Sequence, residues 1–480
     1  MTQRSGCSPK PRFAPASLIV AALALFSALV SSGAIPLSSE LAVGEIPAFA
    51  RKYRTSCSTC HTAAPKLNVF GEAFRLNGYR FPENDKLFRK DRPVPLGGEP
   101  WKDLWPRAIW PGEIPGVVPL ALRVQNDVQL TREAGSAFTW SFRFPQEIYL
   151  LAAATLGDDI SVFLETEWSR ERDLEVLQAK IEFQDLLPRL PSRWLNLWVG
   201  MQNIYLFTFA DRQIDRAGRQ NFLWQTYRIS DLELRRPDTG DSLRSTNEFR
   251  LRQTQPALEL NGIIGGRLYY GFGLAQGVGD LTTDNNNHKD VFYKVRYKIG
   301  GLGLDGRYGP GGGPVQGGGG QLLDRSLTIE HFGYFGAQPV DGDRQDDHRS
   351  FGISARVLYG PADIGVGYVW GENDNPWGAS ASGEVPYSSF FGKAEYLIFP
   401  WLIGSLKFDT FDADVPAALL DAGFTQGGAD QRRILPGIIF LVRQNIRGVI
   451  EAELFTEHEA STQLNDPRPQ NLWFRLDFAF

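Results

Sequence analysis

The chain has 480 residues, a net charge of −5 and a mean hydropathy of −0.24, with 50 glycines and 32 phenylalanines but only two methionines. This length exceeds one ordinary globular core. The slightly negative hydropathy excludes a bundle of membrane helices. The acidic balance excludes a strongly basic nucleic-acid binder, so we expect no nucleic-acid partner.

Residues 1–34 have the organisation of a secretory signal peptide. Three cations precede an apolar run at Ser17–Val30, and small residues follow at 32–34. An N-terminal membrane anchor is the alternative, but this run is short for a membrane span. We therefore expect export to an oxidising compartment and loss of Cys7 with the signal, which leaves two cysteines in the mature chain.

Residues 57–61 read CSTCH, the pattern of c-type haem attachment. The thiols of Cys57 and Cys60 can each bond one vinyl group at a porphyrin edge, and the imidazole of His61 then serves as the proximal iron ligand. The alternatives are a disulfide, a thioredoxin-like pair and a zinc site. A disulfide here would close a ring of little stabilising value. No βαβ pattern surrounds the pair, and no second cysteine pair is available for zinc. We predict one covalent haem c.

The residues after the motif predict a short helix over one face of the haem. Pro65 suits the first turn of a helix. Leu67, Phe70 and Phe74 fall on one helical face, and Asn77-Gly78 ends the helix. Phe70 and Phe74 are therefore predicted haem contacts. An ordinary amphipathic helix is compatible with this, because so small a domain would need the haem as most of its core.

The sixth ligand of the iron is not identified by the sequence. Met201 is the only methionine after Met1, and its parity within its run places it on the apolar face of a strand. The four other histidines lie far along the chain. A weak donor such as Lys66 or Asn68, a histidine of the later region, and an open position all stay as alternatives.

From about residue 117 the apolar residues recur at every second position. In 117–130, VVPLALRVQNDVQL, one face is apolar and the other carries Arg123, Gln125 and Asp127. A soluble β-sandwich and a transmembrane barrel both give this pattern. The barrel is favoured because the runs suit a tilted membrane crossing, aromatic residues recur at their ends, and polar stretches such as 280–290, DLTTDNNNHKD, suit external loops. We expect roughly sixteen strands in contact with outer-membrane lipid.

The final ten residues form the clearest strand. Leucine and phenylalanine occupy alternate positions from Leu472 to Phe480, and Trp473, Arg475, Asp477 and Ala479 lie between them. The strand is similar to the last strand of outer-membrane barrels, whose terminal aromatic residue is read by the barrel insertion machinery. We therefore predict that the protein resides in the bacterial outer membrane.

The expected fold is mainly β, a transmembrane antiparallel β-barrel of about 16 strands with a small N-terminal α-helical c-type haem domain in its lumen. Arg123, Glu165, Lys294 and Lys407 are expected to face that lumen and to hold the haem domain by charge. The predicted parts are a signal peptide (1–34), a cytochrome c-like domain (35–91), a Pro/Trp-rich linker (92–116) and the barrel (117–480). Within the barrel, 206–245 should fold into the lumen or form a long loop, and 309–321 should be a glycine-rich loop.

Residues 46–61, IPAFARKYRTSCSTCH, and 65–79, PKLNVFGEAFRLNGY, followed by a barrel that ends in Phe480, resemble the fused cytochrome–porin family. Its best-known members are outer-membrane iron-oxidising cytochromes. The resemblance implies thioether bonds at Cys57 and Cys60, ligation by His61, and Fe(II) as the favoured donor. Iron-oxidising members carry a further histidine soon after the haem motif, whereas residues 62–80 contain none.

These features predict an electron conduit that passes electrons from an extracellular donor, favoured as Fe(II), through the haem to a periplasmic c-type cytochrome. An Fe(II):cytochrome c oxidoreductase activity would follow from the conduit, and the sequence leaves that activity open. Two other functions compete with it. One is a porin-like channel with a tethered haem domain. The other is a haem enzyme or gas sensor with an open distal site.

Overall fold

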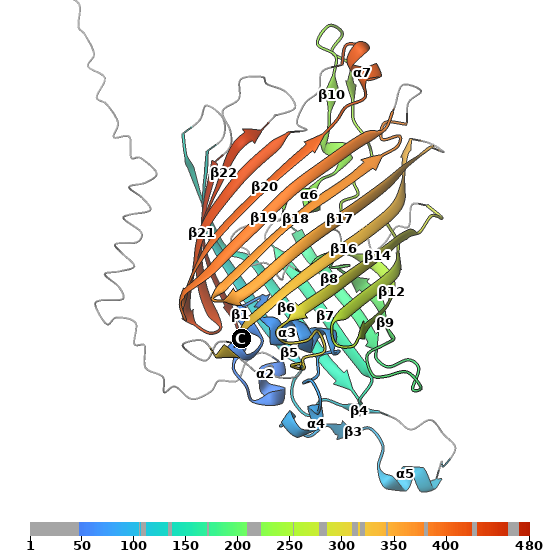
Figure 1. Ribbon diagram of the computed structural model, residues 1–480, viewed down its shortest axis with the longest axis vertical. Helices are drawn as coiled ribbons and strands as arrows, with labels where there is room; N and C mark the ends of the chain where they lie inside the picture. The colour runs from blue at the N-terminus through green and yellow to red at the C-terminus, as the bar shows by residue number, and fades with distance from the viewer. Residues whose placement is uncertain are drawn as a thin grey trace, which may run out of the picture. The chain divides into compact units, whose positions relative to one another are not determined.

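The computed structural model describes most of residues 48–480 (Figure 1). The predicted signal peptide and the first part of the predicted cytochrome domain lie outside the described residues. The gaps after residue 48 are at 105, 107–111, 133–136, 170–171, 209–221, 253, 278–285, 310–314, 317–321, 342–343, 379–382, 425–429 and 459–469.

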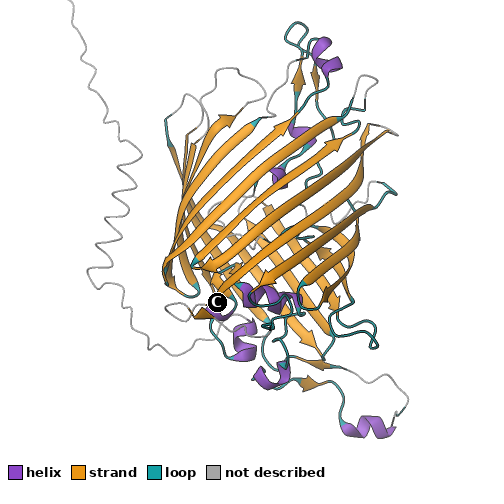
Figure 2. Cartoon of the chain, viewed as in Figure 1, coloured by secondary structure: helices purple, strands orange, loops and turns teal. Residues whose placement is uncertain are grey.

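The described residues form a closed antiparallel barrel of sixteen long strands, which confirms the predicted architecture (Figures 1 and 2). The ring closes where β23 pairs with β5 and where β9 pairs with β12. A two-residue strand, β15 (Val315–Gln316), pairs with the end of β16. The long strands are β5 (Leu120–Arg132), β6 (Thr139–Leu156), β7 (Ile160–Ser169), β8 (Arg172–Phe183), β9 (Asn196–Gln202), β12 (Gln255–Ile264), β13 (Leu268–Ala275), β14 (Asp290–Gly300), β16 (Leu322–Asp341), β17 (Arg344–Gly360), β18 (Ala362–Asn373), β19 (Val385–Phe399), β20 (Leu402–Ala413), β21 (Gln431–Arg443), β22 (Ile446–His458) and β23 (Gln470–Ala479).

The two ends of the barrel differ in their connections. Tight turns at 157–159, 265–267 and 444–445 belong to what we call the short-turn end, where the C-terminus also lies (Figure 1). Longer connections, such as the one between β9 and β12, belong to the loop end. Short turns face the periplasm and longer loops face outward in outer-membrane barrels. The short-turn end is therefore assigned to the periplasm.

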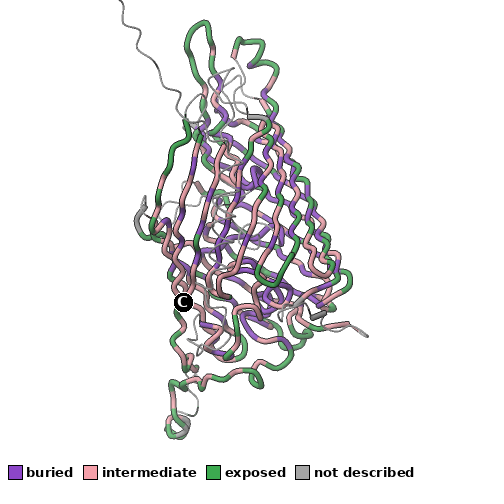
Figure 3. The backbone as a smooth tube through the Cα atoms, turned by 90° about the vertical axis from the view of Figure 1, so that its left-hand side faces the viewer, coloured by how far each residue is buried: buried purple, intermediate pink, exposed green. Residues whose placement is uncertain are grey.

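The outer surface of the barrel is apolar with aromatic residues toward both ends. Tyr359, Tyr396 and Trp401 are exposed toward the short-turn end, and Trp140 and Trp168 toward the loop end. Aromatic girdles of this kind mark the two membrane interfaces. Buried and exposed residues alternate along the strands (Figure 3). The arrangement is that of a barrel in the bacterial outer membrane, as the sequence predicts.

The interior of the barrel wall is charged, as expected, and its charges are paired. Arg123, Glu165, Lys294 and Lys407 are all largely or fully buried inside the ring. The cations, however, pair with carboxylates of the wall instead of with the N-terminal residues, in the ion pairs Arg123–Asp477, Lys294–Glu259 and Lys407–Glu451. Arg123 and Asp477 lie on neighbouring strands, whereas one strand separates the members of each of the other two pairs. In both arrangements the opposite charges satisfy one another at short range. Different luminal residues hold the N-terminal region.

The connection between β9 and β12 folds into the lumen, which was one of the two predicted outcomes. Its described parts, 203–208 and 222–252, are called the luminal segment. They contain α6 (Leu223–Thr226), the 3₁₀ turn η3 (Ile229–Asp231) and the hairpin of β10 (Leu234–Arg235) and β11 (Ser242–Leu243). The Phe207 ring lies 5.7 Å from Trp224 and 4.9 Å from Phe332 of the wall, between ring centroids. This segment therefore places a large apolar cluster across the polar interior.

Residues 48–91, called the N-terminal module, lie at the short-turn end of the lumen. They form α2 (Ala48–Tyr53), η1 (Cys57–Thr59), the hairpin of β1 (His61–Ala63) and β2 (Lys66–Leu67), α3 (Val69–Leu76) and α4 (Asp85–Phe88). The linker that follows contains β3 (Val94–Pro95), α5 (Glu99–Leu104) and β4 (Glu113–Ile114), and α7 (Ala417–Asp421) lies in a loop-end connection. None of the described helices is long and apolar enough to cross a membrane.

The helix after the motif begins later than predicted. Pro65 lies in the turn of the β1–β2 hairpin, and Leu67 belongs to β2. The helix begins at Val69 because the Asn68 side chain caps its first turn, accepting a hydrogen bond from the amide of Gly71. Its end agrees with the prediction.

Candidate functional site

The CSTCH turn is held by one asparagine. The Asn68 side-chain Nδ2 donates to the carbonyl oxygens of Ser58 (3.0 Å) and Thr59 (3.1 Å), and the Asn68 amide donates to the Cys60 carbonyl (2.9 Å). The same side chain caps α3 through Gly71. Asn68 thus joins the turn to the helix. Its amide group is used within the chain, so it does not serve as the weak donor that the sequence left open.

The helix packs directly on the turn because residue 71 is a glycine. A Cβ atom at Gly71 would lie 2.1 Å from the carbonyl oxygen of Cys60. Any larger residue would force α3 and the turn apart. The CSTCH turn and α3 therefore form one packed unit, although the sequence identifies them by two separate patterns.

His61 is oriented as a metal-ligating histidine requires. Its Nδ1 lies 3.3 Å from the carbonyl oxygen of Pro65, which orients the ring and leaves Nε2 available. Burial lowers the pKa of His61 to about 4, so the imidazole is neutral at physiological pH, as a ligand must be. Cys57 and Cys60 are both free thiols, and burial raises the pKa of Cys60 to about 12. This donor set fits a c-type haem.

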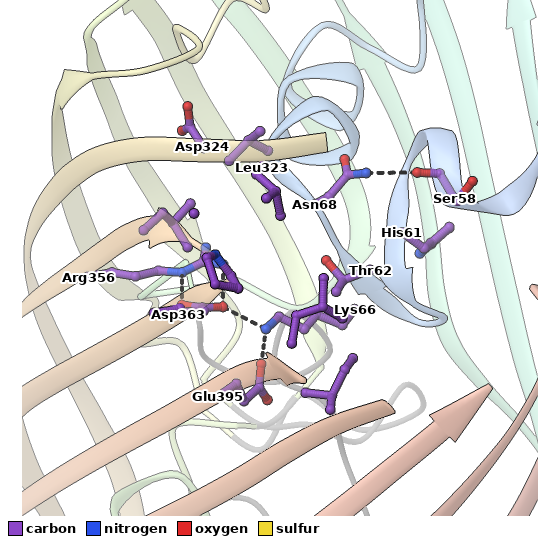
Figure 4. A pocket seen from close by; sticks show the side chains of 17 residues that line it. Ser58, His61, Thr62, Lys66, Asn68, Leu323, Asp324, Arg356, Asp363 and Glu395 are labelled. Carbon is purple, nitrogen blue, oxygen red and sulfur yellow. Dashed lines mark hydrogen bonds and ion pairs between the residues drawn. The ribbon is translucent and has the colours of Figure 1, made fainter. Parts of the chain in front are cut away.

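A pocket beside His61 separates the module from the barrel wall (Figure 4). His61, Thr62 and Lys66 line it from the module, while Arg356 and Glu395 line it from strands β17 and β19. Residues that are widely separated in the sequence therefore meet next to the predicted proximal ligand.

Buried ion pairs cross this junction. Lys66 Nζ pairs with Asp363 at 2.6 Å and also with Glu395, and Arg356 pairs with Asp363 at 2.8 Å (Figure 4). Arg356 also pairs with Glu72 of α3 at 2.6 Å. We call these five residues the ionic latch. Lys66 Nζ already pairs with two carboxylates of the wall. It is therefore not available as the sixth ligand of an iron bound by His61. The sequence could not reveal the latch, since Glu72 and Arg356 are 284 residues apart and Lys66 lies 297 and 329 residues from its two partners.

Further contacts seat the module on the short-turn end. Arg80 donates to the Ser161 hydroxyl (2.8 Å) and to the carbonyl oxygens of Gly157 (3.0 Å) and Ile160 (2.7 Å). Lys52 Nζ donates to the Thr155 hydroxyl (2.8 Å). Burial lowers the pKa of Lys52 to about 8. These contacts come from ordinary basic residues of the module, which no motif distinguishes.

Phe70 and Phe74 lie in an aromatic cluster of the module. The Phe70 ring is 5.1 Å from Phe81, and the Phe74 ring is 5.7 Å from Tyr53. Their predicted contact with a haem stays a prediction. Among the residues of α3, it is Val69 that lines the pocket beside His61.

The barrel histidines are not brought to His61. His348 lies twelve residues along β17 from Gly360, which lines the pocket, so the two are roughly 40 Å apart along the strand. His331 hydrogen-bonds the Tyr293 hydroxyl at 2.9 Å. His288 and His458 lie at the loop end. None of these four positions supports a histidine reaching the module.

Comparison with known proteins identifies the fold alone. No protein-family model and no curated protein matches the chain in sequence. An anion-selective porin from Comamonas acidovorans is similar with a TM-score of 0.50 and 12% identity, over 76% of this chain and 99% of that porin. The outer-membrane channel DcaP of Acinetobacter baumannii is similar with a TM-score of 0.51 and 12% identity, over 76% and 97% of the respective chains. These likenesses show that the barrel has the fold of outer-membrane porins.

Proposed function

We propose that this porin-like barrel carries one covalent haem c on Cys57 and Cys60, with His61 as the proximal ligand, and passes electrons from an extracellular donor to a periplasmic cytochrome. The observation that carries the proposal is the CSTCH turn itself, with His61 Nδ1 at the Pro65 carbonyl and the turn seated in the short-turn end of the lumen. The resemblance to fused cytochrome–porins supports the same function and favours Fe(II) as donor.

The contents of the lumen support electron passage over free diffusion of solutes. The N-terminal module fills part of the short-turn end, held by buried ion pairs with the wall. The luminal segment adds an apolar cluster around Trp224 and Phe391. A diffusion channel needs a path for solutes through both ends of the barrel, whereas an electron conduit needs access for a small donor from the loop end only.

The haem, when bound, supplies a one-electron redox centre. The chain's own residues attach and orient it: two thiols at one edge, an imidazole held by a carbonyl, and a turn braced by Asn68. A haem attached at the short-turn end would be within reach of a soluble periplasmic protein, which supports the proposed acceptor.

A porin-like channel is the second candidate, and the fold likeness favours it. It predicts steady single-channel conductance in planar bilayers, whereas the conduit predicts little. A haem enzyme or gas sensor is the third candidate, because Lys66 and Asn68 are both engaged elsewhere. It predicts a high-spin spectrum and rapid CO binding.

The decisive experiment is an absorption spectrum of protein purified from outer membranes, before and after anaerobic addition of Fe(II). The conduit predicts a c-type spectrum that becomes reduced by Fe(II). His61→Ala should abolish donor oxidation while the barrel still assembles, as judged by its heat-modifiable migration in gels. A protein without haem would refute the proposal and leave the channel. A haem that is reduced only by dithionite would refute Fe(II) as the donor.

A further inference from the structure

The N-terminal module has a charge opposite to that of the whole chain. It contains nine Lys or Arg and four Asp or Glu, a net charge of +5, whereas the chain carries −5. Arg92, the next residue along the chain, adds a further positive charge. Charge of one sign that is concentrated in a small region creates a local field that attracts oppositely charged molecules.

Several of the cations hold the module in place. Arg51 donates to the carbonyl oxygen of Val118 at 2.7 Å, and Lys52 and Arg80 bond the wall as described above. Arg89 pairs with Asp91 at 3.7 Å and with Glu113 at 3.5 Å. These groups contribute to docking and are not free for a partner.

Three cations have no such role. Arg54, Lys90 and Arg92 are exposed, and within the described part of the chain no ion pair engages them. The Lys90 amide donates to the Lys52 carbonyl at 2.9 Å, so the segments 51–54 and 89–92 lie side by side. The three cations therefore belong to one region of the surface.

Apolar side chains accompany these cations. Leu87 and Phe88 of α4 are 67% and 45% exposed, and the Phe88 ring stacks 5.2 Å from Phe81 of the aromatic cluster. Arg54 lies three residues before Cys57, the first predicted thioether site. We call Arg54, Leu87, Phe88, Lys90 and Arg92 the basic face. It combines positive charge and apolar area beside the CSTCH turn.

We propose that the basic face docks the soluble electron carrier of the periplasm, and that this carrier presents acidic side chains around its own redox centre. The inference rests on the proposed function and adds the chemistry of the partner. Short-lived electron-transfer complexes use small interfaces, and complementary charge raises their association rates. Three exposed cations around two apolar side chains match such an interface, and the haem turn next to them gives the docked partner a short path.

The test measures binding without using redox activity. Full-length protein is placed in phosphatidylcholine nanodiscs, and the probes are cytochrome b5, an acidic haem protein, and basic mitochondrial cytochrome c. We expect the acidic probe to bind at 20 mM salt, to bind weakly at 200 mM, and to bind about 10- to 100-fold more weakly after Arg54→Glu, Lys90→Glu and Arg92→Glu together. The control for total charge reverses Arg244, Arg349 and Arg432, which are exposed cations of the loop end, each beside a carboxylate.

Three outcomes would overturn the inference: no binding of the acidic probe to the wild type, equal binding to the reversed variant, or preference for the basic probe. A fourth outcome would also overturn it. If the acidic probe binds in phosphatidylcholine discs but not in phosphatidylglycerol discs, the basic face binds anionic lipid. These results are independent of the haem spectrum. A missing haem with intact binding would refute the electron conduit, whereas Fe(II) reduction with no effect of charge reversal on binding would refute only the basic face.

Discussion

Glu72→Gln tests whether the ionic latch holds the N-terminal module in the barrel. Glu72 lies on α3 and accepts from Arg356 Nη1 at 2.6 Å, and both side chains are less than a tenth exposed. Glutamine keeps the size of the side chain and removes its charge. Arg356 keeps Asp363, with distances of 2.8 and 2.9 Å, so no cation is left without a partner.

The expected loss is that of one buried hydrogen bond to a charged group, about 1.5–3 kcal/mol. At 1.4 kcal/mol for each factor of ten, the undocked fraction of the module should rise about 10- to 150-fold. Hydrogen–deuterium exchange of amides in 69–80 measures this opening, because exchange follows the free energy of local opening. Strand amides of the barrel serve as an internal reference.

Glu83→Gln is the matched control. Glu83 belongs to the same module, but it is exposed and lies 3.9 Å from an equally exposed Arg307. Exposed pairs contribute little, so exchange should change less than about threefold. If Glu72→Gln also leaves exchange unchanged, the latch does not hold the module and the contacts of Arg80 must do so.

Other predictions concern single residues of the module. Gly71→Ala should lower the haem content of the purified protein, measured as pyridine haemochrome, because the added Cβ would lie 2.1 Å from the Cys60 carbonyl oxygen. Gly112→Ala is the control and should leave the haem content unchanged, because its added Cβ would meet nothing within 4 Å. Asn68→Asp keeps the helix cap but loses the two hydrogen bonds that Nδ2 donates to the CSTCH turn. The free energy of local opening of the turn, measured by amide hydrogen exchange, should fall by about 1–3 kcal/mol. Lys52 has a folded pKa of about 8, below its usual 10.5, so the unfolded module binds more protons between these values. Stability of docking should therefore rise with pH from 8 to 10.5, and Lys52→Met should remove that rise.

The fold was largely predictable because a barrel repeats one local rule. Alternation places Arg123 inside and Leu120 outside whatever strands lie next to them, so the period of two identifies the architecture. The fate of the luminal segment was harder to predict. Trp224 and Phe222 stand in a charged, irregular stretch, and only the wall residues opposite them, such as Phe391, make their burial favourable.

The site was predictable only where chemistry imposes spacing. Two thiols and an imidazole must stand at set intervals to hold a porphyrin, so the sequence alone is enough to propose Cys57, Cys60 and His61 as the haem-binding residues. The ionic latch follows no such rule, since Glu72 and Arg356 meet only after the barrel has closed. The misplaced helix start has a similar cause, because Asn68 caps α3 in competition with a proline signal three residues earlier.

The position of the CSTCH turn at the short-turn end limits how an extracellular donor can reach the haem. Strand β17 has 17 residues and extends roughly 55 Å, which at a tilt of about 40° separates the two ends by roughly 40 Å. A donor that stays outside is therefore far from His61, so a small donor has to enter the lumen from the loop end. We expect dissolved Fe(II) to reduce the haem and Fe(II) chelated on a polymer wider than the lumen to leave it oxidised, with both followed by absorption under anaerobic conditions. Equal reduction by the two donors would refute entry. Electrons would then have to cross the barrel through the aromatic rings of its interior, namely Phe207 and Trp224 of the luminal segment and Phe391 of the wall.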